Sequence, residues 1–128
     1  MMIADSDVLI DYLHDRGAAA RVGIELTTRN FATTAVTAFE LRSGARTKKQ
    51  RDGVEALLGA MTILSFGPEE AKKAAELRQG LEADGASIGM ADYMVAAICL
   101  LQRGTLLTRN VKHFGRVPGL RLAGAHDG

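Results

Sequence analysis

The chain has 128 residues, of which 47% are hydrophobic and 24% charged, so length and composition predict one globular domain over residues 1–128. The single cysteine, Cys99, excludes a scaffold held together by internal disulfides. The formal net charge of +1 gives no overall sign of a polyanionic partner.

The hydrophobic runs predict no contact with a membrane. The longest run covers residues 93–101, nine residues, whereas a membrane-spanning helix needs about 20. The N-terminus lacks the basic start and the small-residue cleavage site of a signal peptide. A single cysteine, which forms no internal disulfide, fits a cytoplasmic protein, and we expect one.

Strand and helix patterns alternate along the chain. In chain order they predict a strand at residues 2–4, helices over 8–13 and 18–28, a strand at 31–34, helices over 37–46 and 50–60, a strand at 61–66, helices over 68–84 and 91–102, a strand at 105–108, a helical turn at 111–114 and a strand at 120–123. Such alternation predicts an α/β fold of three layers, in which helices flank a short, mainly parallel central sheet.

Polar residues that follow strands are the first candidates for a site, because ligands bind beyond the carboxyl ends of parallel strands. Asp5 and Asp7 follow the first strand, and Asn110 follows the strand at 105–108. Glu40 and Asp92 stand near the starts of two helices. We expect Asp5, Glu40, Asp92 and Asn110 to converge on one cleft.

Each acid also has a structural explanation. Thr37 and Glu40 match a helix capping box, and Asp5 or Asp7 could cap the helix that follows. Asp92 could complement a helix dipole, although an isolated carboxylate entering so apolar a helix costs free energy unless a cation or a donor meets it.

Three carboxylates in one cleft would need a cation. At about 5 Å apart and an effective dielectric of about 20, each ionised pair repels by about 3 kcal/mol. Mg²⁺ or Mn²⁺ suits one or two carboxylates together with waters and a substrate phosphate. The chemistry that follows is hydrolysis of a phosphodiester, with a water activated by the ion.

Four segments resemble those of one protein family, in the same order and with similar spacing along nearly the whole chain. They read I-A-D-S-D-V-L-I-D at 3–11, V-T-A-F-E-L at 36–41, I-G-M-A-D at 88–92 with A-A at 96–97, and L-T-R-N at 107–110 with H-F at 113–114 and P-G-L at 118–120. Together they resemble PIN-domain ribonucleases, and more narrowly the VapC toxins of VapBC toxin-antitoxin pairs.

The resemblance implies an endoribonuclease that depends on Mg²⁺ or Mn²⁺ and acts as the toxin of a type II toxin-antitoxin pair. Its catalytic residues would be Asp5, Glu40, Asp92 and Asn110. Asp5 and Asp92 would bind the metal, and Glu40 would do so directly or through water. Many family members have aspartate where this chain has Asn110, and we hypothesise that Asp7 supplies a compensating carboxylate.

The resemblance also implies three partners. These are an RNA substrate, a VapB-type antitoxin, and a second copy of the chain in a homodimer. A disordered antitoxin tail would cover the acidic cleft, and one of its arginines would imitate the charge of the metal.

Two other functions compete with the ribonuclease. Asp5 and Asp7 after a first strand resemble the D-x-D motif of haloacid-dehalogenase phosphatases, in which Asp5 would be a covalent nucleophile. That family expects a small hydroxyl residue where this chain has Leu9. The third possibility is a catalytically weak module that binds RNA or the antitoxin.

Basic residues gather in two stretches, residues 41–51 and 93–126, that hold 10 of the 16 lysines and arginines and leave the rest of the chain at −9. Solvated helix faces would explain either stretch, but both flank the predicted cleft and could bind RNA phosphates. The candidates for substrate binding are Arg42, Arg46, Arg109 and Lys112.

The remaining candidate ligands and nucleophiles are assigned structural roles. Cys99 lies in an apolar helix and is predicted to be an inert core thiol. The histidines have no metal-ligand spacing and are predicted to be surface or cap residues. They are His14, His113 and His126.

Overall fold

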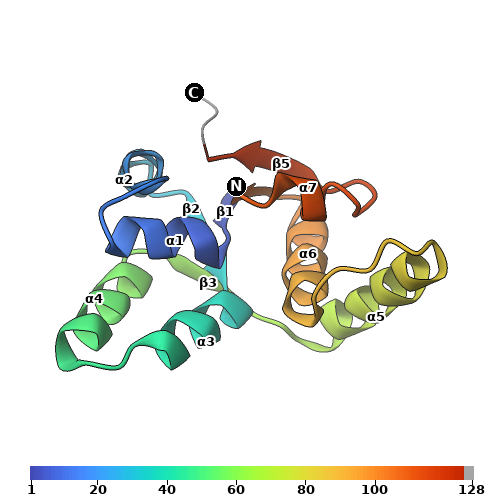
Figure 1. The fold of residues 1–128 in the computed structure, drawn as a ribbon, viewed down its shortest axis with the longest axis horizontal. Coiled ribbons are helices and arrows are strands. Elements are labelled where there is room, and N and C mark those ends of the chain that lie inside the picture. Colours follow the sequence, from blue (N-terminus) through green and yellow to red (C-terminus); the bar gives the residue numbers. More distant parts are fainter. Residues whose placement is uncertain (126–128) are drawn as a thin grey trace.

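The structure, a computed structural model, describes residues 1–125. The five strands are parallel and lie in the order β3-β2-β1-β4-β5, so β1 occupies the centre of the sheet (Figure 1). The strands are β1 (Met2–Ala4), β2 (Phe31–Thr34), β3 (Thr62–Leu64), β4 (Thr105–Thr108) and β5 (Arg121–Gly124). The prediction of an α/β fold with a parallel sheet is confirmed.

Helices cover both faces of the sheet, which gives the predicted three layers (Figure 1). One face carries α1 to α4, and the other carries α5, α6 and the short α7. The helices are α1 (Ser6–Leu13), α2 (Ala19–Thr27), α3 (Ala35–Gly44), α4 (Lys48–Gly59), α5 (Pro68–Ala83), α6 (Met90–Gln102) and α7 (Val111–Phe114). No helix within residues 1–125 is long and apolar enough to cross a membrane.

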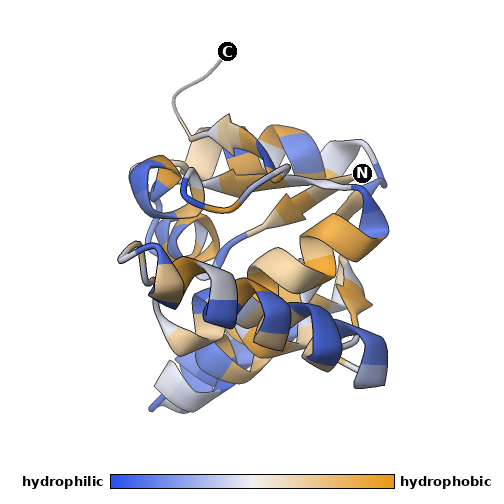
Figure 2. Ribbon diagram, turned by 90° about the vertical axis from the view of Figure 1, so that its right-hand side faces the viewer, coloured by the Kyte–Doolittle hydropathy of each residue, from blue (hydrophilic) through white to orange (hydrophobic). Residues whose placement is uncertain are grey.

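Two hydrophobic clusters, one on each face, hold the layers together. Neighbouring strand residues point to opposite faces, so Ile3 and Leu106 join the cluster under α5 and α6, whereas Ala4 and Leu107 join the cluster under α1 to α4. Figure 2 shows hydrophobic colour along the strands and mixed colour along the helices. Most of α6 is buried, including Cys99, so its prediction as a helix packed within the domain is confirmed.

The connections from strand to helix are short at the edge of the sheet where the acids lie. Asp5 separates β1 from α1 and caps that helix by accepting the Ser6 N–H at 2.8 Å. Thr34 ends β2 and caps α3, which carries Glu40. Because β1 is paired with both β2 and β4, the residues that follow these three strands emerge side by side.

The predicted capping box of Thr37 and Glu40 is wrong. α3 begins two residues earlier than expected, because the Thr34 side chain already accepts the Thr37 N–H at 3.0 Å. Glu40 therefore has no capping role. Other boundaries shift by one or two residues: α3 ends at Gly44, α4 begins at Lys48, β3 spans Thr62–Leu64 and β5 spans Arg121–Gly124.

Candidate functional site

Asp5 is held at the carboxyl end of β1 by two donors. Its Oδ1 accepts the Ser6 N–H at 2.8 Å, and its Oδ2 accepts the hydroxyl of Thr108, the last residue of β4, also at 2.8 Å. The residue is 8% exposed. These bonds fix the carboxylate in one orientation where β1 and β4 end.

The Asp5 carboxylate lacks a cationic partner within residues 1–125. Burial, the Asp7 carboxylate and, to a smaller extent, Asp92 raise the pKa of Asp5 from 3.8 to about 7, although the bonds from Thr108 and Ser6 oppose the shift. Asp5 is therefore a buried acid that the surrounding chain leaves short of positive charge.

Glu40 on α3 and Asp92 in the first turn of α6 belong to the same group of charges. Burial and the charge of Asp92 raise the pKa of Glu40. Burial also raises the pKa of Asp92, while the Gly89 N–H and His113 lower it in part. Asp92 thus lies within electrostatic range of both Asp5 and Glu40, and we call these three residues the acidic site.

Asn110 joins the edge of the acidic site through Thr108 and His113. Its N–H donates to Thr108 Oγ1 at 2.9 Å, and its side-chain Nδ2 lies 3.1 Å from His113 Nδ1. The chain thus brings all four predicted catalytic residues to one end of the sheet. His113, predicted as a surface or cap residue, borders this site, and its spacing of three residues from Asn110 in a helical turn was the signal.

Asp7 faces the turn after β4 rather than solvent. Its Oδ2 accepts the Arg109 N–H at 3.1 Å and lies 3.4 Å from the Thr108 hydroxyl. Its Oδ1 is buried and has no hydrogen-bond partner within the described chain. An orphaned carboxylate oxygen beside Asp5 is compatible with a further ligand there, so the compensating role of Asp7 stays a hypothesis.

The donor set suits a divalent cation that retains waters. Within residues 1–125, no three His, Cys, Asp or Glu side chains are gathered closely enough to hold a metal by themselves. Mg²⁺ is usually bound by one or two carboxylates, and waters complete its octahedron. Asp5 and Asp92, with Glu40 reached through water, fit that description, because all three are oxygen donors whose mutual repulsion a cation would relieve.

Two of the four predicted phosphate-binding residues are engaged with carboxylates. Arg42 forms a bidentate pair with Glu55 at 2.8 and 3.0 Å, and Arg109 Nε lies 3.1 Å from Asp11 Oδ2. Arg46 and Lys112 form no ion pair within residues 1–125. Substrate binding by these residues stays a prediction.

The structural roles assigned to two other residues are confirmed. His14 is the C-cap of α1, and burial raises the pKa of the Cys99 thiol to about 12, which makes it an inert core residue. His126 lies outside the described residues.

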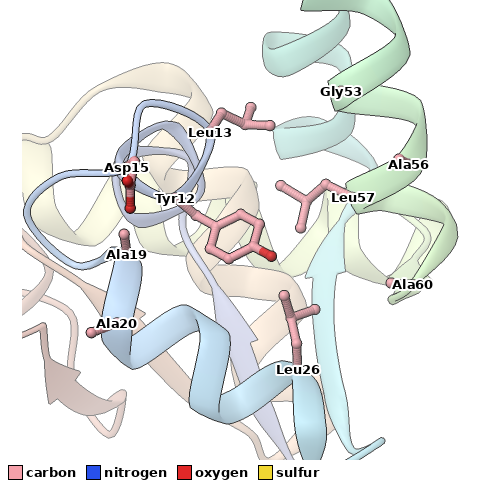
Figure 3. A pocket seen from close by; sticks show the side chains of 10 residues that line it. All are labelled: Tyr12, Leu13, Asp15, Ala19, Ala20, Leu26, Gly53, Ala56, Leu57 and Ala60. Atoms are coloured by element: carbon pink, nitrogen blue, oxygen red, sulfur yellow. The ribbon is translucent and has the colours of Figure 1, made fainter.

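A separate groove of about 610 Å³ runs between α1, α2 and α4 (Figure 3). Its lining is mostly apolar, and the ring of Tyr12 lies between Leu26 and Leu57 in the close view. No residue of the acidic site lines it. The groove and the acidic site are therefore separate surfaces.

Comparison with known proteins assigns the class. The sequence pattern that defines the PIN domain matches residues 2–120. Among solved structures, the VapBC2 complex from Rickettsia felis bound to promoter DNA has a similar chain, with a TM-score of 0.86, 23% identity and coverage of 96% and 97% of the two chains. The DNA-bound VapBC complex from Salmonella typhimurium gives a TM-score of 0.85 at 22% identity and 97% coverage of each chain.

Curated relatives narrow the class. Ribonuclease VapC10 from Mycobacterium tuberculosis is 32% identical over 117 residues, 89% of this chain and 86% of the relative. Ribonuclease VapC2 from Rickettsia felis is 30% identical over 105 residues, 77% of this chain and 78% of the relative. The chain belongs to the PIN-domain family and, within it, to the VapC ribonucleases.

Proposed function

We propose that the protein is an endoribonuclease dependent on Mg²⁺ or Mn²⁺, that it hydrolyses RNA phosphodiesters, and that it acts in the cytoplasm as the toxin of a type II toxin-antitoxin pair. One observation carries the chemistry. Asp5, Glu40 and Asp92 share the carboxyl edge of the sheet with raised pKa values, and the chain supplies no lysine or arginine to pair with them within residues 1–125.

Asp5 and Asp92 are the proposed ligands of the cation, and Glu40 reaches it directly or through water. Thr108 and the Ser6 N–H hold the Asp5 carboxylate in place, so little ordering is required when the ion binds. When bound, a divalent cation supplies activation of the attacking water and neutralisation of charge on the scissile phosphate. Asn110 offers a neutral side-chain oxygen beside this set, while its Nδ2 contacts His113 Nδ1.

RNA phosphates would bind to the basic residues around the site. Arg46 and Lys112 have no carboxylate partner within the described residues and so are the better candidates, whereas Arg42 and Arg109 would have to share their guanidinium groups with Glu55 and Asp11. Counterion release from the RNA would make binding weaken steeply with salt.

Family membership and an RNA cleavage assay distinguish the proposed nuclease from the phosphatase and from the binding-only module. Membership of the PIN-domain family and the match over residues 2–120 oppose a haloacid-dehalogenase phosphatase. The binding-only module remains the second candidate, because Asn110 contributes no charge to the site. Intact RNA at high protein concentration with excess Mn²⁺ would support that second candidate over the nuclease.

A VapB-type antitoxin is the proposed protein partner, and the groove between α1, α2 and α4 suits an apolar segment of it. Its exposed alanines and half-buried leucines could be covered by a partner helix. Ala56→Glu, which puts a charge in the groove, should abolish co-purification with the antitoxin while RNA cleavage persists. The matched control is Ala83→Glu, at an exposed alanine outside that groove.

A homodimer is also proposed, and light scattering of the free protein tests it.

The proposed function is tested by expression of the wild type and of Asp5→Asn in a host without the antitoxin, followed by sequencing of RNA ends. We expect growth arrest and new RNA ends with the wild type alone. Equal arrest by both proteins would show that acid-dependent cleavage is not the cause. The absence of arrest with either would remove the support for a toxin.

A further inference from the structure

Asp11 is a buried acid that the proposed chemistry does not use. It lies in the last turn of α1 and is 2% exposed. Its Oδ2 accepts the Ala18 N–H at 3.0 Å and lies 3.1 Å from Arg109 Nε, and its Oδ1 lies 3.7 Å from Arg16 Nε. Two arginines from different segments therefore meet one buried carboxylate.

Arg109 directly follows β4 and lies at the edge of the acidic site. It stands between Thr108, whose hydroxyl binds Asp5, and Asn110, and its own N–H donates to Asp7 Oδ2 at 3.1 Å. The backbone of Arg109 is thus fixed beside the acids, while the ion pair with Asp11 holds its guanidinium in the last turn of α1. From there its charge still reaches Asp7, where burial raises the pKa and Arg109 lowers it in part.

A second position is open to this guanidinium. Asp7 Oδ1 is buried without a hydrogen-bond partner in the described chain, an arrangement that costs free energy. Asp7 lies within electrostatic range of Asp5. An arginine released from Asp11 could therefore donate to Asp7 Oδ1, and its charge would then occupy the place where a divalent cation is needed.

We propose that Asp11 is a positioning residue: its ion pair with Arg109 keeps that guanidinium away from the acidic site and so keeps Asp5 and Asp92 available to a divalent cation. The inference rests on the proposed function, because it assumes that the acidic site binds Mg²⁺ or Mn²⁺. In this arrangement the fold holds the Arg109 side chain in place, and Asp11 is the residue that holds it.

Gly17 packs closely against the Asp11 carboxylate. Its φ is +52°, a region that favours glycine, and a Cβ at this position would overlap with the Asp11 carboxylate. The substitution Gly17→Ala would therefore displace Asp11 without changing any charge. It offers a second way to release Arg109.

The test is calorimetric titration of the RNA-free protein with Mn²⁺ at low ionic strength. We expect Asp11→Asn, which retains an acceptor for the Ala18 N–H, to weaken Mn²⁺ binding about tenfold, equivalent to about 1.4 kcal/mol. Asp11→Asn combined with Arg109→Gln should restore the wild-type affinity, because the competing cation is gone. Arg16→Gln is the matched control, since it removes the other arginine from Asp11, and it should leave affinity unchanged.

Every result of the Mn²⁺ titration either supports or overturns the proposed role of Asp11. Unchanged Mn²⁺ affinity in Asp11→Asn, or a loss that Arg109→Gln does not restore, overturns it while the proposed function stands. Wild-type protein that takes up no Mn²⁺ overturns both. If Asp11→Asn does not fold, Gly17→Ala and its combination with Arg109→Gln replace it, and they should show the same loss and the same restoration.

Discussion

The two ends of α1 each carry a buried aspartate, and the two are treated differently by the rest of the chain. Asp5, at the start of the helix, receives two hydrogen bonds, but no lysine or arginine within residues 1–125 forms an ion pair with it. Asp11, in the last turn, pairs with Arg109 and Arg16. The helix dipole favours an acid at the start and opposes one at the end, so Asp11 depends more on its partners.

This difference distinguishes a structural acid from a functional one. A buried charge is stable when the chain supplies its counterion, as it does for Asp11. At Asp5, burial and neighbouring acids oppose ionisation and the described chain supplies no counterion, which favours a cation bound from outside. We interpret the unpaired end of α1 as the place for a divalent cation.

The largest expected effect is the loss of RNA cleavage when the aspartate at the start of α1 is replaced. Asp5→Asn should lower RNA cleavage about 100-fold or more, because a lost metal ligand removes several kcal/mol of transition-state stabilisation. Cleavage of a labelled RNA with Mn²⁺ measures the loss. Asp15→Asn, at an exposed aspartate just beyond α1, is the control and should retain wild-type cleavage. A comparable loss of RNA cleavage in Asp15→Asn would show that the effect is not specific to Asp5.

The second prediction concerns stability against pH in the metal-free protein. Folded Asp5 keeps its proton up to a pKa of about 7, whereas the unfolded chain loses it near 3.8. Its contribution to stability is therefore complete below about pH 4 and is lost as the pH rises through about 7, by about 4 kcal/mol in total.

Asp5→Asn should remove that loss and still cap α1. Urea unfolding in the presence of a chelator should give a variant more stable than the wild type at about pH 8, with the difference shrinking toward about pH 4. A difference that does not depend on pH would contradict the account.

The third prediction gives the opposite sign at the other end of the helix. Asp11→Asn should destabilise the protein by about 1–3 kcal/mol, because it removes the counterion of Arg109 while the Ala18 hydrogen bond can remain. The same urea measurement checks it. If both Asp→Asn variants shifted stability in the same direction at about pH 8, the two ends of α1 would not differ as described.

The smallest expected effects come from exposed cations. Arg46→Gln and Lys112→Gln should each reduce the slope of log affinity for single-stranded RNA against log salt by about 0.7, as one phosphate contact would. Filter binding of a non-cleaving Asp5→Asn protein measures the slope. Lys72→Gln, exposed on α5, is the control, and an equal change there would remove any special role for the two basic residues.

The sequence predicted much of the fold, because strand and helix periodicities are local. β4 and α7 were placed at their observed residues, and the parallel sheet followed from the alternation of elements. The four catalytic candidates were selected because each follows a predicted strand or lies near the start of a predicted helix, although α3 in fact begins five residues before Glu40. The start of α3 was missed because Thr34, a strand residue, proved to be the cap.

Contacts between distant segments could not be predicted in this way. Asp11 and Arg109 are 98 positions apart, and nothing in either local pattern indicates that they pair. His113 was predicted to be a surface or cap residue because the histidines lack metal-ligand spacing. Its contact with Asn110 is local, but its place beside Asp92 depends on how α6 and α7 pack. Burial of Asp5 likewise depends on β4 packing beside β1.

Anomalous diffraction from crystals soaked in Mn²⁺ would locate the ion. We expect a manganese peak within ligand distance of an Asp5 or Asp92 carboxylate oxygen, and none at Asp11. The same map would show whether Asp7 contacts the ion or one of its waters. Saturating Mn²⁺ with no peak at the acidic site, or a peak at Asp11 instead, would show that the unpaired end of α1 is not a cation site.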